Sequence, residues 1–394
     1  MAGPLTGVRV VEVAGVVSVP WATMMLADQG ADVIKIEPPG TGDILRHAPI
    51  SCEGMSAFFA NCNRGKRSVA LDLTHPEGRA AALAIVAGAD VFIENHRPGV
   101  LGRLGLGEPD LRAVRPDLVH VSVTGYGPDG PYADGRIYDP IIQGLTGHIA
   151  VQVNPDIPFP DLVRTIVCDK ATALTAAQSI CAALFARERG AGGQHIEIPM
   201  LDAALAFFWP DGMMGETFLA DDVKPGWTLA QVYRLTETAD GHLVYFTVGD
   251  NEMVDLLLAL GREDLAVDPT YCRLEQRVAN FEQVGTVLAA EFRKWKTTDI
   301  LERLRAHGVA AGPVLSLDEV FDDPQVVHNQ VVRVRTHPAV GPMREARPPA
   351  RYSVSQAGEM PLAPVLGQHT AEILAEIGYD ADRIGTLRAA GVLG

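Results

Sequence analysis

Short β-branched segments alternate with helical ones along the first part of the chain. Of all features of the sequence, this alternation restricts the possible folds most strongly. Residues 8–13 (VRVVEV) and 31–37 (ADVIKIE) are apolar and β-branched, and residues 21–29 between them have a helical pattern. Strands joined by a helix in this way run parallel, because the helix carries the chain back across the sheet. The alternation recurs, with predicted helices at 77–87 and 109–114 and predicted strands at 90–94 and 118–124. We therefore predict an α/β fold with a doubly wound parallel sheet in the first half of the chain.

The length of the chain predicts two domains, because 394 residues exceed the usual size of one compact core. An Ala-rich helix is predicted at residues 169–189 and ends at a glycine-rich stop signal. Acidic residues, Pro and Gly at 221–227 indicate a linker. The further predicted elements are strands at 195–198, 241–248 and 309–315 and helices at 201–208, 252–260, 281–293, 298–307 and 370–377. The first domain is thus expected at 1–220, and a smaller α+β domain at 225–315.

Composition excludes several classes of function. The formal net charge of −16 argues against a nucleic-acid surface, which needs a clustered basic face. Apolar stretches are interrupted before they reach membrane-spanning length, and no secretory leader pattern is seen, so a cytoplasmic protein without membrane association is expected. The five cysteines lack C-x-x-C spacing and the histidines lack H-x-x-x-H or H-E-x-x-H spacing, which predicts no metal site.

Residues 125–130 (GYGPDG) match the G-x-G-x-x-G pattern of dinucleotide-binding folds. That function requires a helix to open at the glycines, whereas Pro128 and Pro131 bracket them here. The segment is interpreted as a loop at the carboxyl end of a strand, where open α/β sheets place their ligands. Neither a G-x-S-x-G elbow nor a Walker P-loop is present.

The densest basic cluster is residues 61–67 (NCNRGKR), which contains Arg64 and Lys66. It is either a solvated turn or a phosphate clamp, because Arg offers a bidentate fork and Lys a point charge to an anion. Arg97, Arg103 and Arg136 add cations in loops predicted at the same edge of the sheet.

Asp169 begins the Ala-rich helix. The commonest role of Asp in this position is to cap the helix. The apolar neighbours Val167, Cys168 and Ala171 would leave the carboxylate poorly solvated, which makes it a candidate nucleophile for covalent catalysis.

Several segments together resemble the class III CoA-transferase family, which includes formyl-CoA transferase, carnitine CoA-transferases and α-methylacyl-CoA racemase. The segments are LTGVRVVEVAG (5–15), GADVIKIEPPGTGD (30–43), NRGKRSVALDL (63–73), ENHRPGVLGRLGL (94–106), GYGPDGPYADGRIYDPIIQGLTG (125–147) and LGQHTAEIL (366–374). The resemblance implies a Rossmann-like large domain built from both chain ends, with residues 316–394 returning to it. It also implies a smaller domain between them and an obligate homodimer of two interlocked subunits.

The same resemblance implies that Asp169 attacks an acyl-CoA thioester to form a mixed anhydride and then an aspartyl-CoA thioester. An incoming carboxylic acid would collect the CoA through a second anhydride. Leu71, Asn95, His96 and Arg103 match positions that hold the adenine and ribose-phosphate end of CoA, and Arg136 and Tyr138 match positions beside the pantetheine arm.

Racemases of the family carry His where this chain has Tyr138, and Tyr of ordinary pKa is a poor base near pH 7. Formyl-CoA transferase has Gln where this chain has Val17, and its glycine-rich loop is replaced here by residues 218–224 (FLADDVK). Val16, Val17 and Val19 therefore predict an acyl group larger and less polar than formyl.

Glu252 matches a pocket Glu of the racemases or is an ordinary helix-start residue. A CoA-transferase is favoured, with an α-carbon isomerase or a non-catalytic acyl-CoA-binding protein as the alternatives.

Overall fold

The computed structural model describes residues 3–152, 160–223 and 226–394. The chain divides into two compact units. The large unit comprises Met1–Pro210 and Gln330–Gly394, and the small unit comprises Asp211–Asn329. The sequence placed the small domain at 225–315, so the compact small unit extends further at both ends. Residues 224 and 225 of the predicted linker lie outside the described residues, and the described positions around them form no helix or strand.

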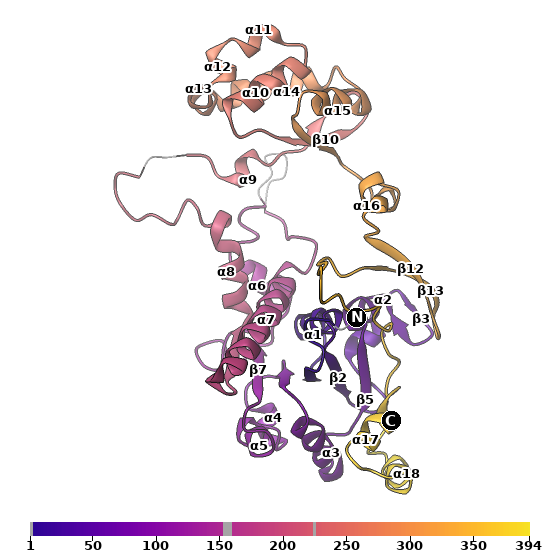
Figure 1. Ribbon diagram of the computed structural model, residues 1–394. Helices are drawn as coiled ribbons and strands as arrows, with labels where there is room; N and C mark the ends of the chain where they lie inside the picture. Colours follow the sequence, from indigo (N-terminus) through magenta and orange to yellow (C-terminus); the bar gives the residue numbers. More distant parts are fainter. Residues whose placement is uncertain (1–2, 153–159, 224–225) are drawn as a thin grey trace. The chain divides into compact units, whose positions relative to one another are not determined.

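A parallel sheet forms the centre of the large unit (Figure 1). In the described residues it has six strands in the order β5-β2-β1-β6-β7-β8. The strands are β1 (Arg9–Val13), β2 (Asp32–Glu37), β5 (Lys66–Ala70), β6 (Val91–Glu94), β7 (Val119–Thr124) and β8 (His195–Pro199). Every pairing in this sheet is parallel. The first strand lies in the middle and the order reverses between β1 and β6, which confirms the predicted α/β fold with a parallel central sheet.

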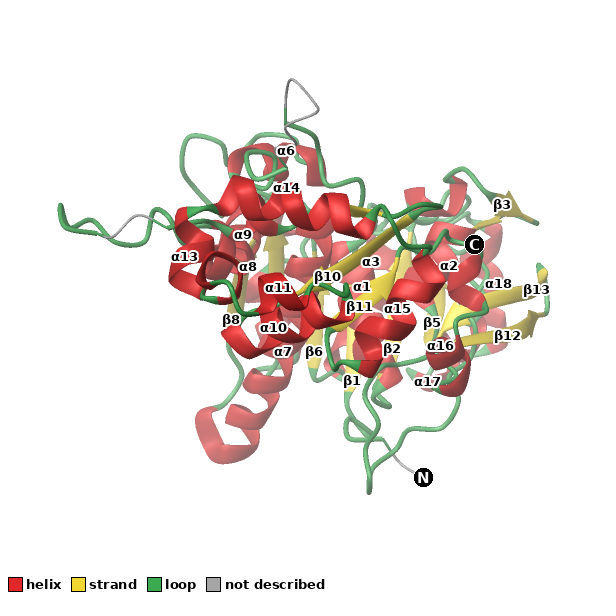
Figure 2. Ribbon diagram, turned by 90° about the horizontal axis from the view of Figure 1, so that it is seen from above, coloured by secondary structure: helices red, strands yellow, loops and turns green. Residues whose placement is uncertain are grey.

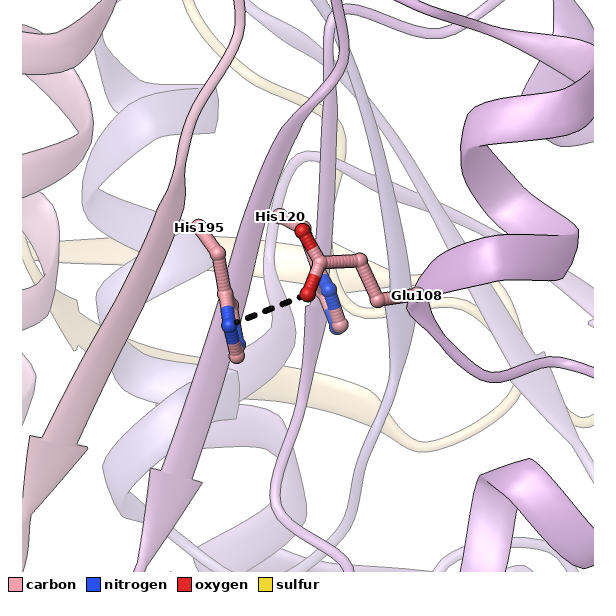
Figure 3. Close-up of side chains that lie close together, drawn as sticks. All are labelled: Glu108, His120 and His195. Atoms are coloured by element: carbon pink, nitrogen blue, oxygen red, sulfur yellow. Dashed lines mark ion pairs between the residues drawn. The ribbon is translucent and has the colours of Figure 1, made fainter.

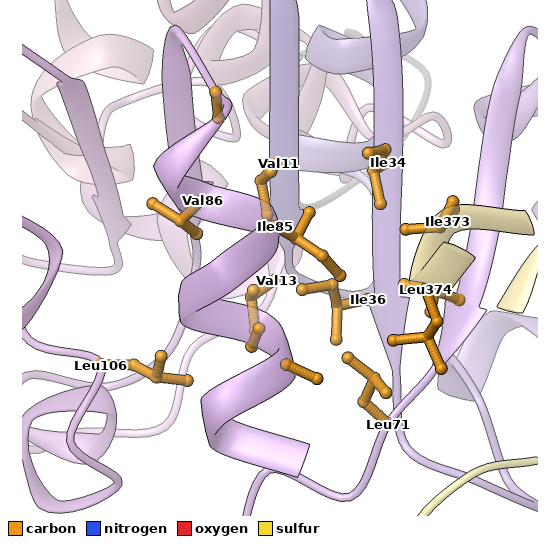
Figure 4. Packing of buried hydrophobic residues seen from close by; sticks show 14 of the residues in the cluster. Val11, Val13, Ile34, Ile36, Leu71, Ile85, Val86, Leu106, Ile373 and Leu374 are labelled. Carbon is orange, nitrogen blue, oxygen red and sulfur yellow. The ribbon is translucent and has the colours of Figure 1, made fainter. Parts of the chain in front are cut away.

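Helices cover both faces of the sheet, so the strands are apolar on both sides. On one face lie α3 (Pro76–Ala87), α5 (Glu108–Val114), α17 (Thr370–Glu376) and α18 (Ala381–Ala389). Figure 4 shows Ile85 and Val86 of α3 beside Val11, Val13 and Ile36 of the strands. The other face packs against α1 (Ser18–Asp28) and α7 (Val167–Ala186).

The small side chains of α7 explain how this helix packs against the sheet and α1. Ala173, Ala176 and Ala177 are buried in the same cluster as Val10, Val33 and the other strand residues of that face. Alanine lets a helix backbone approach its neighbours closely, and it is the best helix former. The Ala-rich composition therefore supports both the length of α7 and its position against α1.

The carboxyl-terminal segment covers the edge of the sheet at β5. Ser68 N donates to His369 Nδ1 (3.1 Å) and Ala70 N donates to Thr370 Oγ1 (3.1 Å). Leu71 and Leu393 form an isolated antiparallel bridge. Both ends of the chain therefore build the large unit. β5 itself was missed from the sequence, because its basic first residues suggested a turn.

The small unit has a three-stranded antiparallel sheet among its described residues, in the order β11-β10-β9. Leu243, Leu256 and Phe292 are in its core. The strands are β9 (Thr236–Glu237), β10 (His242–Phe246) and β11 (Ala310–Pro313). The helices are α9 (Leu229–Val232), α10 (Asp250–Ala259), α11 (Glu263–Ala266), α12 (Pro269–Cys272), α13 (Leu274–Ala279), α14 (Phe281–Phe292), α15 (Thr297–Ala306) and α16 (Pro324–His328).

Shorter elements complete the large unit. They are β3 (Ser51–Cys52), β4 (Met55–Ser56), α2 (Ala57–Asn63), α4 (Val100–Arg103), α6 (Asp139–Leu145) and the hairpin β12 (Val332–His337) with β13 (Gly341–Ala346). The boundary between the two units, at Pro210 and Asp211, falls within α8 (Met200–Gly212). The hairpin is visible as paired yellow arrows in Figure 2. Within residues 3–152, 160–223 and 226–394, no helix combines the length and the apolar character needed to span a bilayer.

Candidate active site

Asp169 lies in the first turn of α7, with 7% of its surface exposed. Ile166, the residue before this helix, provides no side-chain cap. Instead Asp139 Oδ2, at the start of α6, accepts hydrogen bonds from the backbone N–H groups of Cys168 (2.8 Å) and Asp169 (3.0 Å). The helix-capping role that was the alternative for Asp169 is thus filled by Asp139, which leaves the Asp169 carboxylate available for another contact.

That contact is the hydroxyl of Ser18, the first residue of α1. Ser18 Oγ donates a hydrogen bond to Asp169 Oδ1 inside the protein. Burial raises the pKa of Asp169 to about 6; the Ser18 hydrogen bond opposes this rise, and the nearby charge of Asp139 adds to it. Near neutral pH the group is a poorly solvated carboxylate, and this state favours attack on an electrophilic carbonyl carbon.

The position of Ser18 depends on the loop between β1 and α1. In this loop Val16 has φ of +67°, a left-handed conformation that is unusual for a β-branched residue. Val16 N donates to Asp43 Oδ1 (3.1 Å), and Gly15 exchanges two hydrogen bonds with the side-chain amide of Asn95. Asn95 follows β6, so it joins the two loops at the point where the strand order reverses. Ligands of open α/β sheets bind at this point.

A buried ion cluster supports the same loop from beneath. Lys35 Nζ contacts Glu12 Oε1 (2.7 Å), Asp43 Oδ2 (3.0 Å) and the carbonyl oxygen of Ala14 (2.7 Å). Lys66 Nζ contacts Glu12 Oε2 (2.8 Å). Burial opposes ionisation of Glu12, but the two ammonium groups prevail and lower its pKa to about 2. Burial lowers the pKa of Lys66 to about 8, which its contact with Glu12 partly offsets. The loop backbone is therefore anchored to paired buried charges.

A pocket of about 310 Å³ opens at the carboxyl ends of β6 and β7. It is lined by Asn95, His96, Arg97, Pro98, Thr124, Gly125, Ala133, Gly135, Arg136, Ile137 and Tyr138. Four of these, Asn95, His96, Arg136 and Tyr138, are predicted CoA contacts, and Gly125 belongs to the loop that was predicted to lie at this edge. Tyr138 directly precedes Asp139, whose carboxylate holds the backbone of Asp169. The pocket wall and the candidate nucleophile are thus connected through one short segment.

Comparisons with known proteins agree with this architecture. A sequence model described as CoA-transferase family III matches residues 5–370. The chain belongs to CoA-transferase family III. It is 36% identical to the succinate–glutarate CoA-transferase of Agrobacterium fabrum, over 95% of this chain and 96% of that protein. It is 32% identical to the human succinyl-CoA:glutarate CoA-transferase, over 99% and 90%.

A solved structure is also similar to nearly the whole chain. The crystal structure of a CAIB/BAIF family protein from Brucella suis superimposes with a TM-score of 0.80 at 33% sequence identity. The alignment covers 96% of this chain and all of that one. The protein is therefore an enzyme of CoA-transferase family III, and membership of this family implies CoA thioesters as substrates.

Lys66 and Arg64, two basic residues predicted to clamp a phosphate, instead form buried ion pairs with carboxylates of the protein itself. Lys66 is fully enclosed against Glu12, and Arg64 makes a bidentate ion pair with Asp28 at 2.8 and 2.6 Å. Buried ion pairing satisfies the ammonium and guanidinium groups, so their geometry does not fit the phosphate-clamp hypothesis. The alternative of a solvated turn does not fit either, because both side chains are buried.

The side chains of Leu71 and Val17 also lie in apolar clusters. Leu71 is fully buried among the residues beneath α3, and Val17, with 2% exposed, packs against Leu45 and Phe59. Neither side chain lines the pocket. Val16, half-buried beside the same cluster as Val17, enters the site through its backbone.

The other predicted site residues lie outside the pocket. Arg103 ends α4 and is exposed. Glu252 belongs to the small unit, where its Oε2 accepts a hydrogen bond from Val248 N (2.6 Å) at the start of α10. This contact matches the helix-start alternative for Glu252. Ser18, Asp43 and Asp139 were missed from the sequence. Only Asp139 had a visible signal, as the Asp-Pro pair that starts a helix.

Proposed function

We propose that this family III enzyme moves CoA from an acyl-CoA thioester to a carboxylic acid, with Asp169 as the covalent nucleophile. The observation that carries the proposal is a buried carboxylate whose backbone is held by Asp139 and whose oxygen is held by Ser18. Asp139 directly follows Tyr138 in the wall of the pocket that contains four predicted CoA contacts. A fixed nucleophile next to a bound thioester divides a difficult exchange into easier steps.

In the proposed sequence, the Asp169 carboxylate attacks the thioester carbonyl, the C–S bond breaks, and a mixed anhydride and CoA thiolate result. The thiolate attacks the aspartyl carbonyl, which releases the donor acid as its carboxylate and forms an aspartyl-CoA thioester. An acceptor carboxylate attacks that thioester and forms a second anhydride. The released thiolate then attacks its acyl carbon, which yields the new acyl-CoA and regenerates Asp169. Protons and electrons balance without a further reactant.

We also propose short dicarboxylic acids, such as succinate and glutarate, as donor and acceptor. The similarity to two relatives named for succinate and glutarate supports this class. A panel of acyl-CoAs and acids, read by mass spectrometry, tests it. Succinyl-CoA with glutarate is expected to exchange fastest, and a preference for formyl-CoA with oxalate would contradict the proposal. The interlocked homodimer and the cytoplasmic location stay predictions, and light scattering of the purified protein tests the first.

Hydrogen exchange at the α-carbon distinguishes the transferase from an isomerase. We expect no deuterium to enter acyl-CoA from heavy water when no acceptor acid is present. The position at which racemases of the family carry His is occupied here by Tyr138, in the wall of the pocket. Incorporation of deuterium at a rate comparable to turnover would favour the isomerase instead.

The rate of transfer is expected to depend on pH through Asp169. Only the carboxylate attacks, so kcat/KM should fall roughly tenfold per pH unit below the pKa of about 6. In Ser18→Ala the hydrogen bond that lowers this pKa is lost, and the acidic limb should move to higher pH. Measuring kcat/KM from pH 4.5 to 8.5 for both proteins checks the sign. A shift to lower pH in the variant would contradict the assignment.

Arg136 is expected to hold the CoA rather than take part in the chemistry. Its exposed guanidinium lines the pocket and can pair with an anionic part of the thioester. Arg136→Ala should raise KM for acyl-CoA about tenfold, with kcat changed less than about twofold. Arg189→Ala, whose guanidinium lies over Phe185 outside the pocket, serves as the charge-matched control. An unchanged KM in Arg136→Ala would exclude this role.

A further inference from the structure

Two histidines and a glutamate meet at the amino-terminal edge of the parallel sheet. His120 is the second residue of β7 and pairs in register with His195, the first residue of β8, while Glu108 begins α5. One ligand atom of each residue lies within 4.8 Å of those of the other two. Figure 3 shows the Glu108 carboxylate beside the two stacked rings. The candidate active-site pocket is lined by Thr124, at the opposite end of β7, so this cluster is separate from it.

Ser122 contacts the Nε2 atoms of both rings. The imidazoles stack with centroids 4.4 Å apart and planes 14° apart. Ser122 Oγ lies 3.0 Å from His195 Nε2 and 3.4 Å from His120 Nε2. A hydroxyl oxygen has two lone pairs and can accept from both Nε2–H groups. In that arrangement each Nδ1 carries a lone pair, and both are suited to be ligands.

The two Nδ1 atoms differ in their surroundings: one lies near a carboxylate, and the other has no hydrogen-bond partner among the described residues. His195 Nδ1 lies 3.4 Å from Glu108 Oε2. His120 is 6% exposed, and its Nδ1 is buried without a hydrogen-bond partner among the described residues. A buried polar atom of this kind is uncommon in native proteins and calls for an explanation.

We propose that Glu108, His120 and His195 bind one divalent transition-metal ion, with Zn²⁺ as the probe, through Glu108 Oε2 and the two Nδ1 atoms. Two histidines and a carboxylate are an established zinc ligand set, with bonds of about 2.0–2.2 Å. Because the two rings stack with their planes 14° apart, one imidazole would turn out of the stack so that both in-plane Nδ1 lone pairs meet one ion. Ser122 would hold the Nε2 side of the ring that keeps its place, as outer contacts of metal sites do.

Arg112 is the cation that faces this cluster, and its contacts are compatible with the proposal. Its Nε lies 3.3 Å from Glu108 Oε1, and its Nη1 donates to the carbonyl oxygens of Pro116 and Leu118. It therefore engages the carboxylate oxygen that the metal does not use, and it orients Oε2 toward the histidines. Such an ion would join α5, β7 and β8, so the proposed role is stabilisation of this edge.

The test uses the purified full-length protein, treated with a chelator, dialysed and titrated with ZnCl₂. Equilibrium dialysis with elemental analysis is expected to find one Zn²⁺ per chain, and the thermal midpoint should rise with added Zn²⁺. Glu108→Gln and His195→Asn keep side chains of similar size and should weaken binding at least about 100-fold, beyond the loss typical of altering an outer contact. His242→Ala, which removes an exposed histidine of the small unit, should bind like wild type.

Visible absorption of the Co²⁺-loaded protein adds a readout that does not depend on folding stability. A tetrahedral spectrum is expected in the wild type and in His242→Ala, and its loss is expected in Glu108→Gln and His195→Asn. The proposal is overturned if the wild type binds well below one Zn²⁺ per chain, or if the cluster variants bind as tightly as His242→Ala. In either outcome Glu108, His120 and His195 are a packed polar cluster without a metal ion.

Discussion

Asp169→Asn is expected to lower kcat for CoA transfer by on the order of 10⁴-fold or more. Every step of the proposed sequence forms or consumes an intermediate on the Asp169 carboxylate, which asparagine cannot provide. Asparagine keeps the size of the side chain and can still contact Ser18, so α7 and its packing should be retained. Steady-state assays with succinyl-CoA and glutarate measure the loss. Circular dichroism spectra of the two proteins should coincide, which separates a lost nucleophile from a lost fold.

A trapping experiment identifies the intermediate itself. Wild-type enzyme incubated with acyl-CoA and hydroxylamine should carry a modified Asp169 in peptide mass spectra, and Asp169→Asn should carry none. Asp202→Asn is the matched control, because Asp202 also lies in the first turn of a helix, α8, but is exposed. This control is expected to keep full activity and to be trapped at Asp169. Substantial transfer by Asp169→Asn would exclude the covalent mechanism.

Glu12→Gln is expected to destabilise the enzyme by about 3–5 kcal/mol, the cost of removing one partner from a buried ion pair. Glu12, Lys35 and Lys66 have fully buried side chains, and the carboxylate contacts both ammonium groups at 2.7 and 2.8 Å. Without it, the two lysines would repel each other in a poorly solvated place. Urea-induced unfolding followed by circular dichroism measures the change in the free energy of unfolding.

Glu376→Gln is the control for Glu12→Gln. Glu376 also contacts two cations, Arg9 and Arg67, but its side chain is 34% exposed. Exposed ion pairs contribute about 0–1 kcal/mol, so this variant should unfold close to wild type. If both variants lost the same small amount, the cluster beneath the β1–α1 loop would not be the anchor inferred here.

Much of the large unit could be predicted because local patterns and tertiary packing agree there. The β-branched runs became β1, β2, β6, β7 and β8, since strands covered on both faces read as continuous apolar segments. β5 was missed because its first residues are Lys66 and Arg67. Their charges suggested a solvent-exposed turn, and only partners from distant segments, Glu12 and Asp32, allow them to begin a strand.

The candidate site was predicted unevenly for a related reason. Asn95, His96, Arg136 and Tyr138 meet in one pocket because loops after neighbouring parallel strands share one edge of the sheet. Leu71 and Val17 also follow strands of this sheet, β5 and β1. The side chains of consecutive residues, however, point in different directions. Proximity in the sequence therefore did not show which of them face the pocket.

The sequence by itself determined five of the six strands of the parallel sheet, the family and the identity of Asp169 as the residue to test, because these depend on local pattern and on motifs kept in order. Tertiary structure alone decided that Asp139 caps α7, that Ser18 contacts Asp169, and that Glu108, His120 and His195 meet. Each of these contacts joins residues far apart in the chain. Their distances are set by how the sheet and its helices pack, which no local pattern encodes.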